Sequence, residues 1–119
     1  MRSLVIKCTS GAEDPERCNQ AFTVAAAGVA AGAPVSLWLT GEAAWFGVPG
    51  RAEEFHLELA TPLAELRDLV LTGGTLTVCS QCAQRRGLVQ ADLLDGTRLA
   101  GAATFTEEAL AETAQALVY

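Results

Sequence analysis

The chain has 119 residues, half of them apolar and 18% charged, which is the balance of a packed globular domain and not of a disordered chain. Its eight basic and fourteen acidic side chains give a formal charge of −6. No basic run offsets this charge, so the composition argues against a nucleic-acid-binding function. We expect a single domain over residues 1–119.

The first half of the chain predicts a strand, a helix and a second strand. Leu4–Cys8 is a short apolar run typical of a buried strand. Asp14-Pro15 predicts a helix start, because Asp can cap free N–H groups and Pro fits the first helical position. This helix should run to about Ala31 and end at Gly32. The next predicted strand covers residues 34–40, and residues 43–46 suggest a helical turn.

Three further elements are predicted between residues 61 and 86. Thr61-Pro62 repeats the helix-start pattern, and Gly73-Gly74 should stop that helix. Thr75–Cys79 reads as a buried strand. Ser80 is expected to cap a short helix that ends at Arg86.

The last part of the chain predicts a strand, a helix and a short final strand. The strand covers residues 97–100, and residues 91–94 before it suggest a turn. Thr106 is expected to open the helix, whose apolar side would carry Leu110, Ala114 and Leu117. Residues 117–119 suggest a fifth short strand. The alternation of strands and helices predicts an α/β fold with a mainly parallel sheet and helices on both faces.

Residues 18–41 contain no charge, a length that can span a bilayer. Gly32-Ala33-Pro34 breaks the segment, so a buried helix followed by a buried strand is the better interpretation. Leu4-Val5-Ile6 is too short for a signal peptide. We therefore expect no membrane association and a cytoplasmic protein with reduced cysteines.

Two of the four cysteines lie close together. Cys79 ends a predicted strand, and the carboxyl ends of parallel strands are where ligands and chemistry collect. Cys82 falls in the first turn of the next helix, where free N–H groups favour a thiolate. Arg85 or Arg86 can approach the Cys82 sulfur on the helix surface. Nucleophilic attack or sulfur transfer is the chemistry of such a thiolate.

Other interpretations of the cysteines remain open. Any cysteine can be a small buried hydrophobe, and for Cys8 and Cys18 this is the preferred interpretation. A zinc site is disfavoured, because Cys79 and Cys82 supply half of a tetrahedral set and the single histidine, His56, reads as structural. The spacing of two residues between the cysteines also allows a dithiol oxidoreductase. We expect no metal and no cofactor.

The chain resembles the DsrE/DsrF-like family, which includes YchN-like and TusD-like sulfur-relay proteins, over essentially its whole length. The similarity is carried by residues 5–7, 11–17 and 32–39, and most specifically by residues 79–87, which read CSQCAQRRG. Cys79 takes the position of the family's persulfide-carrying cysteine, with Arg85, Arg86 and Gly87 at the family's spacing. Cys82 is similar to the second cysteine of some YchN-like members.

The resemblance implies a three-layer α/β/α sandwich with a parallel sheet of five strands. It also implies a homo-oligomer, a trimer or hexamer, and sulfur transfer between donor and acceptor proteins through a persulfide. Cys79 and Cys82 are the candidate catalytic residues, with Ser80, Arg85 and Arg86 in support. Trp45, Phe46 and Val48 are candidates for a subunit contact, or they pack on their own sheet.

Three functions follow from these residues and the resemblance. The first is a persulfide carrier or sulfurtransferase-like protein with Cys79 as acceptor. The second is a dithiol redox protein or sensor, because Cys82 can resolve a persulfide on Cys79 and release sulfide. The third is a non-catalytic interaction subunit of a homo-oligomer.

Overall fold

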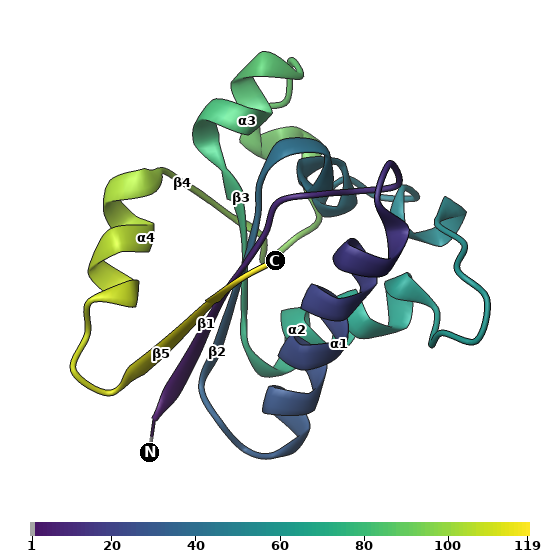
Figure 1. Cartoon of the computed structure of the whole chain (residues 1–119). Coiled ribbons are helices and arrows are strands. Elements are labelled where there is room, and N and C mark those ends of the chain that lie inside the picture. Colours follow the sequence, from purple (N-terminus) through teal and green to yellow (C-terminus); the bar gives the residue numbers. More distant parts are fainter. Residues whose placement is uncertain (1) are drawn as a thin grey trace.

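A computed structural model describes residues 2–119, which form one sheet of five strands with helices around it (Figure 1). The strands are β1 (Ser3–Cys8), β2 (Val35–Leu39), β3 (Thr75–Cys79), β4 (Arg98–Ala100) and β5 (Ala114–Val118). The α-helices are α1 (Pro15–Ala30), α2 (Leu63–Gly73), α3 (Ser80–Arg85) and α4 (Ala102–Ala109). Three short 3-10 helices are η1 (Gly41–Gly47), η2 (Ala52–Glu54) and η3 (Gln90–Asp92). No helix within residues 2–119 is long and apolar enough to cross a membrane.

The sheet is parallel throughout, in the order β4-β3-β2-β1-β5. Helices α1 and α2 cover one face, α4 lies on the other, and α3 stands above the carboxyl ends of the strands (Figure 1). The chain reverses direction across the sheet after β4, so the β4-to-β5 connection must cross on the face opposite α1. The predicted α/β class and three-layer arrangement are confirmed.

The main core lies between the sheet and helices α1 and α2. Ile6, Leu37 and Val78 are fully buried on this face, and Phe22 of α1 packs against them. Gly28 lets α1 approach closely, since a Cβ there would lie 2.9 Å from Val35 Cγ2. Close packing of this kind contributes much of the stability of an α/β domain.

The helices begin near the predicted residues but without the predicted caps. Asp14 precedes α1, yet its side chain caps no N–H group and instead pairs with Arg17 at 3.4 Å. Pro62, and not Thr61, occupies the cap position of α2. Ser80 is the first residue inside α3, with Cys79 at the cap position. The tertiary packing of each helix therefore sets its start more than side-chain capping does.

The prediction for the last helix is wrong. Helix α4 is Ala102–Ala109, so Thr106 lies inside it, and Ala114 and Leu117 belong to β5. The Thr106 hydroxyl donates to the Ala102 carbonyl within the helix and caps nothing. The physical reason is that residues 114–118 pair with the free edge of β1, which satisfies their backbone groups better than a longer exposed helix.

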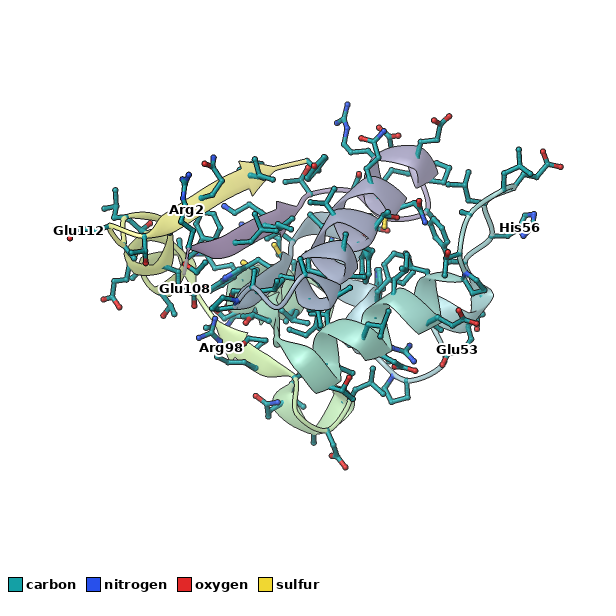
Figure 2. All side chains as sticks on the ribbon, turned by 90° about the horizontal axis from the view of Figure 1, so that it is seen from below. Arg2, Glu53, His56, Arg98, Glu108 and Glu112 are labelled. Carbon is teal, nitrogen blue, oxygen red and sulfur yellow. The ribbon has the colours of Figure 1, made fainter. Side chains whose placement is uncertain are left out.

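The carboxylate of Glu108 makes the polar contacts between helix α4 and the sheet. Glu108 accepts hydrogen bonds from the Ser36 hydroxyl at 2.6 Å and from Trp38 Nε1 at 3.0 Å, and it pairs with Arg98. Figure 2 shows Arg98 and Glu108 close to one another on the α4 side of the sheet. Phe105 of α4 also packs edge-on against Trp38, with ring centroids 5.5 Å apart.

Glu108→Gln should destabilise the protein at neutral pH. Burial by itself raises the pKa of Glu108, but hydrogen bonds from Ser36, Trp38 and Arg98 outweigh it and hold the pKa below the ordinary value of 4.5. The stabilisation is therefore complete above the unfolded pKa and is lost as the pH falls through the folded one. We expect a loss of about 2 kcal/mol in the free energy of unfolding at pH 7. In urea unfolding, a difference from wild type that does not shrink below about pH 4 would contradict this account.

Candidate functional site

The two close cysteines lie where β3 turns into α3. Cys79 is the last residue of β3 and is half-buried, while Cys82 is buried, with 8% of its surface exposed. Buried Leu76, Thr77 and Val78 anchor the strand, so the junction that follows them is held at the carboxyl edge of the sheet. This is the placement expected from the sequence.

Cys79 is the residue that favours the thiolate. Burial raises the pKa of Cys79, but the Cys82 backbone N–H, the Cys82 thiol, the Gln81 N–H and the charge of Lys7 together lower it below the ordinary value. A half-exposed sulfur with a lowered pKa is suited to nucleophilic attack.

Cys82 favours the thiol. Burial raises the pKa of Cys82, and the negative charge of the neighbouring Cys79 raises it further, against the lowering effect of the Gly41 N–H. The expectation that the helix start makes Cys82 the thiolate is therefore wrong. Position in the first turn matters less than burial, because removing the sulfur from water penalises the charged form. Of the two thiols, Cys79 is therefore the one that loses its proton more readily.

Gly41, the first residue of η1, lies against Cys82. Its backbone N–H donates to Cys82 Sγ at 3.2 Å. Its φ is +55°, and a Cβ would lie 2.8 Å from the Thr9 carbonyl oxygen in the loop after β1. The segments that follow β1, β2 and β3 thus meet at Gly41, beside Cys82, and only glycine fits there without strain.

Gly41→Ala should destabilise the fold and disturb the hydrogen bond from the backbone of residue 41 to the Cys82 sulfur. The added methyl group meets a backbone carbonyl in a backbone conformation that disfavours side chains, so we expect a loss of about 1–3 kcal/mol in the free energy of unfolding. Gly50→Ala is the matched control, because Gly50 has φ +84° with nothing within 4 Å of a Cβ. Equal losses for the two variants in urea unfolding would contradict the close contact with Thr9.

Arg86 ties α3 to η1. Its guanidinium donates to the Cys82 carbonyl oxygen at 3.0 Å and pairs with Glu42 at 2.7 Å. Arg86 therefore approaches the backbone of Cys82, although the sequence suggested its sulfur. Arg85 is exposed, and Ser80 is half-buried without a capping bond.

Cys8 and Cys18 form a separate buried pair. Cys8 pairs in register with Leu39, and Leu39 with Val78, so Cys8 lies on the α1 face while Cys79 lies on the α4 face. Both Cys8 and Cys18 are fully buried, and the Cys8 thiol donates to the Ser10 carbonyl at 3.2 Å. These two cysteines do not join the site.

Other sequence candidates lie outside the site as well. His56 is exposed in the loop after η2 (Figure 2). Within residues 2–119 no group of three or more His, Cys, Asp or Glu side chains is placed to hold a metal ion. Phe46 is buried between Phe22 and Phe55, so it is not available for a subunit contact. Trp45 is covered by Arg51, whose guanidinium lies 4.3 Å from the ring centroid.

Sequence reasoning missed two residues of this region, Gly41 and Lys7. A glycine directly after a predicted strand signals an unusual turn, but only the fold reveals that it faces Cys82. Lys7 interrupts an apolar strand, and its odd position places it on the face opposite Ile6 and Cys8. The alternation of side chains between the two faces of this strand was therefore the sequence signal that could have pointed to Lys7.

The family model described as DsrE/DsrF-like family matches residues 2–117. The solved structure titled "Crystal structure of ychN protein from E.coli" superposes with a TM-score of 0.83 at 16% identity, and the match covers 100% of both chains. No curated protein matches the chain. The structural likeness, at this identity, bears on the fold alone.

Proposed function

The chain belongs to the DsrE/DsrF-like family, and from this premise we propose that it carries sulfane sulfur as a persulfide on Cys79. The observation that carries the proposal is the state of Cys79, a half-exposed sulfur whose pKa is lowered by neighbouring N–H groups, the Cys82 thiol and Lys7. A thiol of ordinary pKa is mostly protonated at neutral pH and reacts slowly. The position of Cys79 at the carboxyl edge of a parallel sheet also supports a chemical role.

The transfer requires only the Cys79 thiolate and a donor. The thiolate attacks the sulfane sulfur of the donor, a new S–S bond forms on Cys79, and the donor's S–S bond breaks. The electron pair of the broken bond leaves with the donor fragment as a thiolate. An acceptor thiolate then attacks the outer sulfur and returns Cys79 to its thiolate form. The backbone N–H groups beside Cys79 stabilise its charge at the start and end of this cycle.

Cys82 supports a second candidate function, a dithiol redox protein. Its thiol lies beside Cys79 and interacts with it, as the opposite shifts of the two pKa values indicate. The Cys82 thiolate can attack the Cys79 sulfur of a persulfide, which forms a disulfide and releases sulfide. The two cysteines are then oxidised and the sulfane sulfur is reduced, so an external thiol must reduce the disulfide before the next cycle.

The direct test is to load the wild-type protein with inorganic polysulfide and measure its intact mass. We expect a gain of one sulfur atom, about 32 Da, that a reducing thiol removes, since only an accessible thiolate reacts quickly. Peptide mapping should place the sulfur on Cys79. Sulfur found only on Cys8 or Cys18, or no gain at all, would overturn the proposal.

We also propose a homo-oligomer, a trimer or hexamer, as the working form, in a reducing compartment such as the cytoplasm. Strand β5 is an edge of the sheet, and Val118 on it is 65% exposed. Leu110, just before β5, is 78% exposed. An exposed strand edge with apolar side chains is a surface that proteins usually cover. Light scattering during size-exclusion chromatography should give three or six times the chain mass of 12.4 kDa.

A further inference from the structure

Lys7 lies on the same face of the sheet as Cys79. It is in register with Trp38 of β2, and Trp38 with Thr77 of β3, so these three residues form one row across the α4 face. Cys79 is the next residue of β3 on that face and one step nearer the carboxyl edge. The Lys7 ammonium lies 4.1 Å from the centroid of the Phe105 ring, under α4.

The positive charge of Lys7 has no carboxylate partner. None of the ion pairs formed by residues 2–119 includes Lys7, and its side chain is half-buried. The other cation on this face, Arg98, is neutralised by Glu108. A half-buried ammonium held against an aromatic ring is poorly solvated, so it attracts negative charge more strongly than an exposed lysine. Cys79 lies on the same face, two strands across and one step nearer the carboxyl edge, and its sulfur is close enough for the charge of Lys7 to act on it and on a reagent that approaches it.

We propose that Lys7 is a specificity-determining residue that draws small anionic sulfur donors, of the thiosulfate class, to Cys79. This inference rests on the proposed sulfur-carrying function. The chain as a whole carries a charge of −6 and repels anions, so an anionic donor needs a local positive charge at the reacting sulfur. Lys7 supplies that charge, and it also lowers the pKa of Cys79 after the larger effects of burial and hydrogen bonding.

With thiosulfate the step balances without another reactant. The Cys79 thiolate attacks the outer sulfur of thiosulfate, the S–S bond of thiosulfate breaks, and sulfite leaves with the electron pair. The total charge is −3 before and after the step. Negative charge builds up at Cys79 when a dianion approaches the thiolate, and Lys7 carries the opposite charge on the same face. A positive charge near this point stabilises the transition state and lowers the activation barrier of the transfer.

The test compares two alkylating reagents of similar size, anionic iodoacetate and neutral iodoacetamide, by their rates at Cys79. Both react with the same thiolate, so the ratio of the two rates reports local charge and not the thiolate fraction. Lys7→Met should lower the ratio of the iodoacetate rate to the iodoacetamide rate about threefold to tenfold. Lys7→Arg should restore most of the ratio, which a purely structural role does not predict.

Arg2→Gln is the matched control. It removes one positive charge just before the same strand, five residues or roughly 16 Å away, well beyond the screening length in physiological salt. This variant should leave the ratio unchanged. A ratio that falls equally in Arg2→Gln and Lys7→Met would overturn the inference, because the effect would then come from net charge.

The salt dependence of the two alkylation rates in the wild-type protein tests the inference without any variant. If Lys7 dominates, added salt should lower the ratio of the iodoacetate rate to the iodoacetamide rate at Cys79. If the net charge of −6 dominates, added salt should raise this ratio, and the inference is overturned.

Loading with thiosulfate distinguishes a failure of this inference from a failure of the proposed function. Wild type should gain one sulfur from thiosulfate, and Lys7→Met should gain it about threefold to tenfold more slowly. Loading from polysulfide but not from thiosulfate would overturn the donor class and leave the carrier function standing. Loading from neither would overturn the carrier function, while the alkylation ratio would still decide the role of Lys7.

Discussion

Cys79→Ser is expected to reduce the rate of sulfur loading by at least a factor of about 100, because a serine hydroxyl stays protonated at neutral pH and does not form a persulfide. Cys82 cannot substitute for the lost residue, since it is buried and its pKa is raised by burial. Intact mass measured over time after addition of polysulfide gives the rate.

The matched control for this experiment is Cys18→Ala. Cys18 is fully buried in α1 among core residues, so its removal should cost stability and leave the loading rate unchanged. Rapid loading of Cys79→Ser, with the sulfur mapped to Cys82, would contradict the assignment of the thiolate to Cys79. It would instead mean that the helix position of Cys82 outweighs its burial.

Cys82→Ser is expected to load as fast as wild type but to keep its persulfide at least about tenfold longer. In the wild-type protein the Cys82 thiol is held beside Cys79, so attack on the Cys79 sulfur is intramolecular and favoured by proximity. The products are a disulfide and sulfide, and serine can form neither. The measurement is sulfide release together with intact mass after one equivalent of sulfur has been loaded.

The pH dependence of sulfide release is a second reading of the same step. Cys82 must lose its proton to attack, and burial and the charge of Cys79 raise its pKa. The rate of sulfide release from wild type should therefore rise with pH up to that raised pKa, and the variant should show no such rise. Equal rates of release in wild type and Cys82→Ser would exclude the dithiol function and leave Cys79 as a simple carrier.

Helix α4 and the strand after it show which features local sequence patterns cannot predict. Glu107 and Glu108 after Thr106 look like the first turn of a helix, because acidic residues are favoured there. In the structure Glu108 lies near the end of α4 and binds Ser36, Trp38 and Arg98. Two of those partners are 70 or more residues away in sequence, so no local pattern can predict the pairing.

By itself the sequence determined the alternation of strands and helices, the parallel sheet and the place of Cys79 at the end of β3. These features depend on short-range patterns, namely apolar runs of strand length and the residues that end them. The resemblance across residues 79–87 belongs to the same local stretch.

The tertiary structure alone decided which of the two close cysteines has the lower pKa. That outcome depends on the burial of Cys82, which outweighs the lowering effect of the Gly41 N–H of η1, and on Lys7 of β1. It also decided that Cys8 faces away from Cys79, because strand register sets which face each side chain takes. The physical reason is the same in each case: folding sets the neighbours of a sulfur, and with them its pKa, from groups that lie far from it along the chain.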